Sequence, residues 1–212
     1  MIRGDINMEA IVSAVIGELK ARLFIEVEAS GRHVHVSKQD LESLFGTGYR
    51  LTPAKELSQP GQYACQERVT IQGPKGTIKN VVILGPERRN TQVEVSLTDC
   101  NVLGVKAPVR LSGDIEGSPG ITIINEKNGK SITITNGLIV AKRHIHITPE
   151  DACRFGVENG ETVKVKVFGE RPLIFDDMDV RVSKDFQTYI HIDYDEANAC
   201  GYTKGTKGMI LK

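Results

Sequence analysis

The feature that most constrains this chain is a six-residue motif that occurs twice. Residues 32–37 read Arg-His-Val-His-Val-Ser, and residues 143–148 read Arg-His-Ile-His-Ile-Thr. In a β-strand, residues two apart point to the same face, so each motif presents two imidazoles on one face and aliphatic side chains on the other. Each copy is therefore expected to supply half of a shared metal site.

The repeat continues past the histidines. Ser37 and Thr148 are followed three residues later by Asp40 and Asp151, which is the spacing of a hydroxyl cap at the start of a helix. In the second copy Pro149 falls at the first helical position, where its missing N–H is harmless. A strand, a His-x-His pair and a short capped helix thus form a repeated unit. This repeat predicts two related halves that converge on one site.

Length and composition limit the number of domains and the classes of function that the chain can have. A chain of 212 residues can form one large domain or two small ones, and the repeat favours two. Lysine plus arginine and aspartate plus glutamate both number 27, so no basic surplus favours nucleic acid as a partner. No apolar run approaches the roughly 18 residues of a membrane span, so we expect no membrane partner and a cytoplasmic protein. The cysteines lack a Cys-x-x-Cys pair and are expected to be free core thiols: Cys65, Cys100, Cys153 and Cys200.

Most of the chain has the pattern of short strands, so the expected fold class is mainly β. Alternating apolar residues predict strands from residue 23 onward and at 67–72, 77–84, 91–97, 106–112, 120–125, 131–135, 138–142, 163–167, 180–182 and 189–192. Asn-Gly pairs at 128–129 and 136–137 indicate hairpins. A short helix is expected at 38–45, and residues 47–66 are expected to form a long irregular loop.

Residues 5–22 carry apolar side chains at helical spacing and predict an amphipathic helix. Gly17 weakens such a helix by roughly 1 kcal/mol relative to alanine, so the helix is expected to need a partner surface. That surface is either the chain's own domain, another subunit, or a docking partner that the helix targets.

The metal ligands are expected among six residues. Four of the five histidines lie in the repeated motif, and His191 lies at the end of a later strand, just before a capping pattern. Glu94 lies on the polar face of the strand at 91–97. Six ligands are too many for one catalytic zinc that keeps an open position, but they suit two metals with three ligands each. Zinc is the default ion for a site without redox chemistry.

A cationic group is expected at the same site. Arg88 and Arg89 lie in a Gly-Pro loop shortly before Glu94. A planar guanidinium is suited to hold phosphate through two parallel hydrogen bonds, although an arginine pair on a surface can also be merely solvated.

Together these motifs resemble a known family. The two His-x-His motifs, the segments 85–88 and 91–94, the phrase at 59–64, and residues 191–193 and 195–199 resemble the PduL-type phosphate acyltransferases, or phosphate propanoyltransferases. The resemblance covers about residues 25–201.

The resemblance implies a two-barrel fold with a dimetal zinc site that exchanges coenzyme A and phosphate on a short acyl group. One metal would be held by His33, His35 and Glu94, the other by His144, His146 and His191, and Arg88 would bind phosphate. We expect an N-terminal helix at 1–22, one barrel from 23–31 with 142–212, and a second from 32–141. The partners implied are acyl-CoA, phosphate, another copy of the chain and, through residues 5–22, a bacterial microcompartment shell, which would place the protein in its lumen.

Two other interpretations compete with this one. His144, His146 and Glu150 nearly match the ligand spacing of a single-metal cupin enzyme, but the first motif offers no matching glutamate. A non-catalytic binding module held together by structural zinc would also use these residues, and it predicts fully closed coordination.

Overall fold

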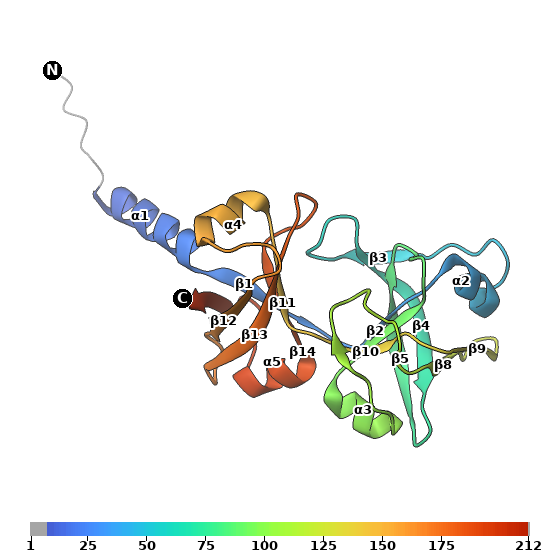
Figure 1. The fold of residues 1–212 in the computed structure, drawn as a ribbon. Helices are drawn as coiled ribbons and strands as arrows, with labels where there is room; N and C mark the ends of the chain where they lie inside the picture. Colours follow the sequence, from blue (N-terminus) through green and yellow to red (C-terminus); the bar gives the residue numbers. More distant parts are fainter. Residues whose placement is uncertain (1–7, 212) are drawn as a thin grey trace.

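The computed structural model describes residues 8–211, which form two β units lying side by side (Figure 1). The expected mainly β class is confirmed, with short helices on the outside of each unit. The helices are α1 (Met8–Leu23), α2 (Lys38–Phe45), α3 (Leu97–Leu103), α4 (Pro149–Phe155) and α5 (Tyr194–Cys200). Residues 5–7 of the expected N-terminal helix lie outside the described residues.

The first unit, here called the barrel unit, is a closed six-stranded barrel. Its strands in order are β1 (Ile25–Ser30), β14 (Tyr189–Asp193), β11 (His144–Ile147), β13 (Leu173–Val182), β12 (Thr162–Val167) and β15 (Lys207–Leu211). Fully buried aliphatic side chains such as Ile145, Val165 and Ile190 fill its core. The barrel closes through β15, which pairs with both β1 and β12.

The second unit, here called the sheet unit, is a curled nine-stranded sheet. The order is β7 (Val109–Arg110), β10 (Leu138–Ala141), β6 (Gln92–Val95), β2 (His33–His35), β5 (Thr77–Gly85), β4 (Tyr63–Gln72), β8 (Ile121–Asn125) and β9 (Lys130–Ile134), and β3 (Pro53–Glu56) pairs with β4. Val34, Ile83 and Val93 lie side by side across its centre and are completely buried.

Three predicted elements differ in the structure. The hairpin expected at 136–137 is wrong, because the flanking strands do not pair with each other: β9 pairs with β8, and β10 pairs with β6 and β7. The strand expected at 91–97 ends at Val95, because Ser96 and Asp99 form a capping box that starts helix α3. Leu97 therefore begins a helix and is 55% exposed instead of continuing the alternation. The expected loop at 47–66 contains β3 and the start of β4, and Tyr63 and Ala64 pair with strand β5.

The two motif copies occupy equivalent positions in the two units. In the sheet unit His33 lies opposite Glu94 on antiparallel β6, and in the barrel unit His144 lies opposite His191 on antiparallel β14. Ser37 and Thr148 cap the following helices, as the sequence predicts. The repeat thus extends to the neighbouring strand, where one copy has a carboxylate and the other an imidazole.

The chain passes between the units twice, and each crossing leads directly into a His-x-His motif. Strand β1 of the barrel unit is followed by β2 of the sheet unit, and β10 of the sheet unit is followed by β11 of the barrel unit. The assignment of 23–31 with 142–212 and of 32–141 to separate domains remains our proposal for the domain boundaries.

Helix α1 extends away from the barrel unit (Figure 1), and most of its apolar side chains are exposed. Seven of them are between 46% and 65% exposed: Met8, Ile11, Val12, Val15, Ile16, Leu19 and Leu23. The helix has 16 residues. None of the helices in the described part of the chain is long and apolar enough to cross a membrane.

Candidate functional site

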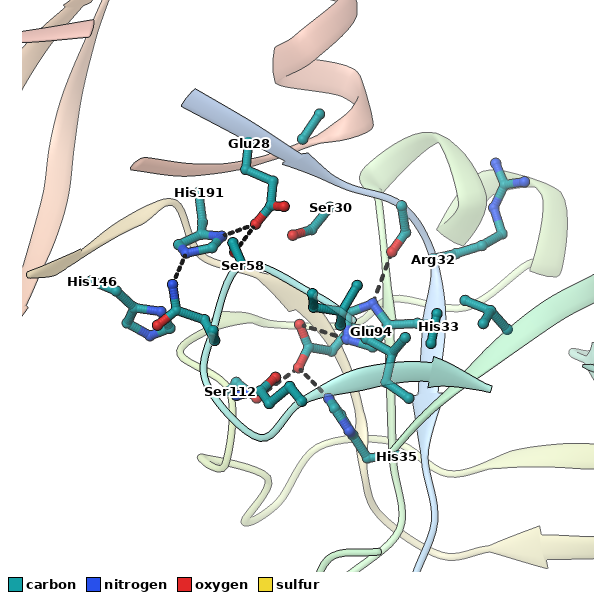
Figure 2. Close-up of a pocket in the computed structure, with 18 of the residues that line it drawn as sticks. Glu28, Ser30, Arg32, His33, His35, Ser58, Glu94, Ser112, His146 and His191 are labelled. Carbon is teal, nitrogen blue, oxygen red and sulfur yellow. Dashed lines mark hydrogen bonds and ion pairs between the residues drawn. The ribbon is translucent and has the colours of Figure 1, made fainter. Parts of the chain in front are cut away.

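A pocket with a volume of about 540 Å³ lies where the two units meet. Strands from both units line it, and the loop at 57–62 of the sheet unit covers part of it (Figure 2). All six expected metal ligands and Arg88 lie on or beside this pocket. The fold therefore brings five histidines from three strands, and Glu94 from a fourth, to one place.

The first group of potential ligands comes from the sheet unit. His33 and His35 lie on β2 and Glu94 on the neighbouring β6, and all three are buried. One ligand atom from each lies within 4.8 Å of the others. Nε2 of His33 is 3.5 Å from Oε2 of Glu94, and Nε2 of His35 is 3.9 Å from Oε1 of the same carboxylate. Figure 2 shows both rings directed toward this carboxylate.

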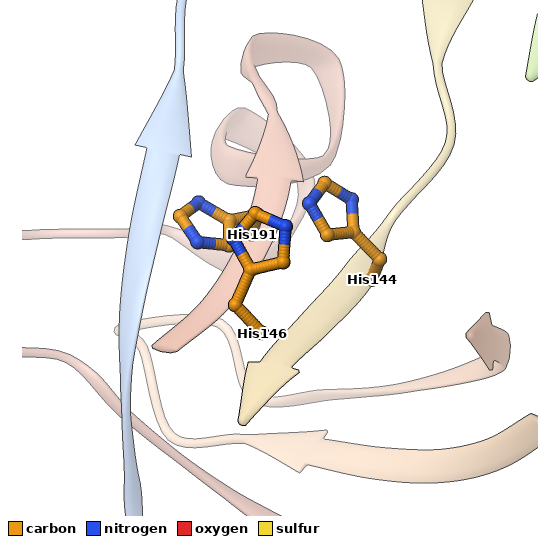
Figure 3. A group of neighbouring side chains, drawn as sticks. All are labelled: His144, His146 and His191. Carbon is orange, nitrogen blue, oxygen red and sulfur yellow. The ribbon is translucent and has the colours of Figure 1, made fainter. Parts of the chain in front are cut away.

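The second group comes from the barrel unit. His144 and His146 lie on β11, and His191 lies opposite His144 on β14 (Figure 3). Their ring centroids are 4.6–5.0 Å apart, and one nitrogen from each lies within 4.8 Å of the others. Three imidazoles thus converge without a carboxylate among them.

The first histidine of each motif is oriented by the backbone just before it. Nδ1 of His33 is 2.8 Å from the carbonyl oxygen of Gly31, and Nδ1 of His144 is 2.8 Å from that of Lys142. An imidazole that donates Nδ1–H to a carbonyl keeps a lone pair on Nε2, which is the usual arrangement of a metal-binding histidine. The same contact in both units shows that the repeat preserves ring orientation.

The environment favours neutral imidazoles in the second group. Burial is the main factor that lowers the pKa of His144 and His191, and it lowers the pKa of His146 to about 3, with further contributions from neighbouring histidines and Arg181. Neutral rings have the free lone pairs that a metal needs.

The first group differs because it contains a carboxylate. Burial alone would raise the pKa of Glu94, but His33, His35 and the Ser112 hydroxyl together lower it below its usual value. The pKa of His35 is lowered mainly by burial, then by His33 and Arg88. Burial also acts to lower the pKa of His33, but the charge and hydrogen bond of Glu94 outweigh it, so this pKa is raised. Glu94 is therefore an anion at neutral pH.

These residues fit divalent metal ions by their chemistry. Imidazole nitrogens with one carboxylate, or three imidazoles alone, are ligand sets that suit zinc and other first-row transition metals. In addition, Nδ1 of His35 and Nδ1 of His146 are buried without a hydrogen-bond partner, and most buried polar atoms have one. Two ligand groups facing one pocket fit a pair of ions.

Arg88 approaches the first group through a chain of hydrogen bonds. Its Nη1 donates to Ser112 Oγ at 2.8 Å, and this hydroxyl donates to Glu94 Oε1 at 2.7 Å. Gln92 Nε2 also donates to Ser112 Oγ, at 3.0 Å. The arginine is thus held at the pocket wall by a neutral group rather than by a carboxylate. Arg89, its expected companion, is exposed and does not line the pocket.

Sequence reasoning missed Arg181, which also lines the pocket. Arg181 lies opposite His146 in the parallel pairing of β13 with β11. Neighbours across a sheet point to the same face, so its guanidinium belongs to the site. In the sequence it is one polar residue between two valines, and only the strand register reveals its neighbour.

The loop at 57–62 connects the units across the pocket. Gln59 is buried, and its Nε2 donates to the backbone oxygen of Gln187 at 3.1 Å, while its Oε1 accepts from the Gln187 N–H at 3.3 Å. Ser58 Oγ donates to Glu28 on β1 at 2.5 Å. In the sequence, Gln59 is indicated only by the resemblance of residues 59–64 to the phosphate acyltransferase family.

The competing single-metal interpretation does not fit the structure. Glu150 is exposed on α4 and belongs to neither ligand group. The expectation that all four cysteines are core residues is also wrong at one position, because Cys153 is exposed while the other three are buried. Burial raises the pKa of Cys65 to about 12, so this thiol is protonated and is not a nucleophile at neutral pH.

The buried histidines predict that the metal-free protein is sensitive to acid. A group whose pKa is lowered by folding contributes stability above its ordinary pKa, and this contribution is lost as the pH falls toward the folded value. With a folded pKa of about 3, His146 alone lowers the free energy of unfolding by about 2 kcal/mol between pH 6.5 and 5. Urea unfolding of chelator-treated protein at pH 7.5 and 5 measures this. Equal midpoints at both values would contradict the lowered pKa values.

The geometry agrees with the comparisons between this chain and known proteins. The phosphate propanoyltransferase family model matches residues 26–203. The phosphate propanoyltransferase of Enterococcus faecalis is 59% identical over 208 residues, covering 97% of this chain and 98% of the relative. That of Clostridioides difficile is 60% identical over 205 residues and covers 97% of both chains, and that of Thermotoga maritima is 57% identical over 189 residues and covers 89% of both. The chain therefore belongs to the phosphate propanoyltransferase family.

Proposed function

We propose that this protein transfers a short acyl group, propanoyl or acetyl, between coenzyme A and inorganic phosphate at two zinc ions in the pocket. An oxygen of hydrogen phosphate attacks the thioester carbonyl carbon, a C–O bond forms, and the C–S bond breaks. The proton of the phosphate passes to the leaving thiolate, which yields acyl phosphate and free coenzyme A. No covalent intermediate with the protein is needed.

One observation carries this proposal. Two groups of three ligand side chains and Arg88 face the same pocket, although they come from different units. A structural metal is enclosed by its ligands, whereas a catalytic metal has three protein ligands and an open position. Three ligands per group beside a pocket of about 540 Å³ therefore favour a catalytic site over a non-catalytic binding module held together by structural zinc.

The ligand groups would be His33, His35 and Glu94 for one ion and His144, His146 and His191 for the other. Bound zinc ions would supply positive charge that polarises a carbonyl oxygen and stabilises a departing thiolate. Arg88 offsets the charge of the phosphate and orients it, because a guanidinium presents paired donors to two phosphate oxygens. The Ser112 hydroxyl fixes the position of Arg88 by accepting a hydrogen bond from its guanidinium, and this hydroxyl is itself held by donating to the ionised Glu94.

The proposed activity is tested by following thiol release from acetyl-, propanoyl- and butanoyl-CoA with and without phosphate. We expect release to require phosphate and to be reversible. Acyl preference is measured in the same experiment, since one methylene changes binding by only about 1–3 kcal/mol. Equal release without phosphate would identify a thioesterase, and no release from fully metal-loaded protein would contradict acyl transfer.

We propose that α1 docks the enzyme to another macromolecule, because its apolar side chains are not covered by the chain's own units. The candidates are a second copy of this chain and a microcompartment shell, which would place the enzyme in the lumen. Exposed apolar patches of this kind commonly mark interaction sites.

Deletion of residues 1–22 tests the role of α1. We expect the truncated protein to retain its fold and its phosphate-dependent thiol release, because α1 does not line the pocket. Its self-association, measured by light scattering, or its co-sedimentation with shells should be lost. If truncation instead abolishes folding or activity, the helix is part of the core of the enzyme.

A further inference from the structure

Besides Arg88, the pocket contains a second arginine, Arg181, which has no part in the proposed reaction as described above. Arg181 comes from β13 of the barrel unit, and Arg88 comes from the loop after β5 of the sheet unit. Arg181 lies opposite His146, and Arg88 is linked to Glu94 through Ser112. Each ligand group thus has its own guanidinium, one from each unit.

Neither arginine has an anionic partner of its own. Among residues 8–211, no carboxylate forms an ion pair with Arg88 or Arg181, whereas other arginines have close carboxylates. Arg32 is 2.9 Å from Asp99, and Arg143 is 2.6 Å from Glu196. These two arginines directly precede the His-x-His motifs. Their charges are neutralised within the fold because each has a carboxylate partner.

The charges of Arg88 and Arg181 are therefore incompletely compensated. Burial is the main factor that lowers the pKa of both guanidinium groups. Glu94 partly offsets this effect on both, and Asp179 also offsets it on Arg181, although neither carboxylate forms an ion pair with these arginines. Arg181 lowers the pKa of Arg88 further, which indicates that the two cations repel one another. Partly buried cations of this kind are stabilised by a bound anion, and a doubly charged anion can neutralise both.

The contacts of Arg181 leave its donors available. Its guanidinium lies 5.7 Å from the centre of the Phe186 ring, which orients the plane of the group. Within residues 8–211, the hydrogen-bond contact of this side chain is with Nε2 of His146, at 3.4 Å. A metal bound at this nitrogen would take its lone pair, so the Nη1 donor of Arg181 would then be free for an anion.

We propose that Arg181 is a second phosphate-binding residue, so that inorganic phosphate is held between Arg88 of the sheet unit and Arg181 of the barrel unit. This proposal rests on the proposed acyl transfer to phosphate. Two planar guanidinium groups can contact different oxygens of one phosphate and leave another oxygen for attack on the thioester. Binding from both sides also fixes the direction of that attack.

Phosphate binding can be measured without turnover. Isothermal titration calorimetry with inorganic phosphate compares the wild type, Arg181→Gln and Arg181→Lys, each with the metal it contains after purification. We expect Kd to rise at least ~10-fold in Arg181→Gln, because a charge-assisted hydrogen bond and a positive charge are lost. Arg181→Lys should lie between the two, because lysine restores the charge but not the paired donors.

Arg154→Gln is the matched control. Arg154 also lies over an aromatic ring, 5.2 Å from the centre of Phe155, but it is salt-bridged to Asp151 and does not line the pocket. Its Kd for phosphate should equal that of the wild type. Metal content is determined for all variants and should be unchanged.

Three results would overturn the role of Arg181. The first is an unchanged phosphate Kd in Arg181→Gln, and the second is metal loss in both Arg181 variants, which would mean that the residue acts through His146. The third is weaker binding of free coenzyme A with unchanged phosphate binding, which would assign Arg181 to the phosphates of the cofactor. Failure of the proposed function has a different signature, namely wild-type protein that binds phosphate but shows no phosphate-dependent thiol release.

Discussion

Replacing Glu94 by glutamine is expected to abolish acyl transfer and to reduce the metal content from two ions per chain to one. Glutamine keeps the shape of the side chain but removes the negative charge that would complement a metal held by His33 and His35. Because a bound metal contributes several kcal/mol to transition-state stabilisation, kcat should fall at least ~10³-fold. Elemental analysis and phosphate-dependent thiol release measure the two effects separately.

A buried carboxylate elsewhere in the same sheet is the appropriate control. Glu67 accepts hydrogen bonds from Tyr49 and from the backbone of Thr52, and it lies outside the pocket lining. Glu67→Gln should lower stability while keeping both metals and the phosphate dependence. If wild-type protein purified without chelators holds one metal or none, the two-metal proposal is wrong.

Replacing Arg88 by alanine should impair the use of phosphate while the metals remain bound. The guanidinium does not belong to either group of potential ligands, so its loss leaves all six of those residues in place. Loss of a charged donor aimed at the nucleophile should lower kcat/KM for phosphate by about 10²-fold, with a smaller change in KM for acyl-CoA. Steady-state kinetics with each substrate varied in turn measures this difference.

The adjacent arginine provides the comparison for this variant. Arg89 has the same charge and lies in the same loop, but it is exposed and outside the pocket. Arg89→Ala should therefore behave like the wild type. An unchanged phosphate KM and kcat in Arg88→Ala would remove Arg88 from the proposed phosphate site.

The fold class could be predicted because most strands alternate clearly and because the motif repeats. One error occurred where a polar side chain changed the role of an alternating pattern. Ser96 looked like one more outward-facing residue of a strand, but with Asp99 it caps a helix. Strand β15 was missed because its residues 207–211 have no clear alternation, although pairing with both β1 and β12 makes it part of the barrel.

The members of the candidate site differ in how visible they are in the sequence. His33, His35, His144 and His146 are visible because two imidazoles at strand spacing are rare and occur twice. Arg181 and Ser112 carry no local signal, and Gln59 is indicated only by the family resemblance of residues 59–64. Arg181 reaches the pocket through strand register, Ser112 is joined to it by its hydrogen bond to Glu94, and Gln59 lies in a loop that contacts the barrel unit. Such tertiary neighbours cannot be inferred from spacing along one strand.

The two crossings between the units bear on how substrates enter and leave. Each crossing leads within three residues into a pair of histidines, so a hinge motion there would displace the potential ligands themselves. Opening the enzyme by separating its units would therefore compete directly with metal retention. The loop at 57–62, which covers part of the pocket and is attached to the barrel unit through Ser58 and Gln59, contains none of the six potential ligands. In this protein, the segment that covers the pocket and the strands that carry the potential ligands are separate parts of the chain.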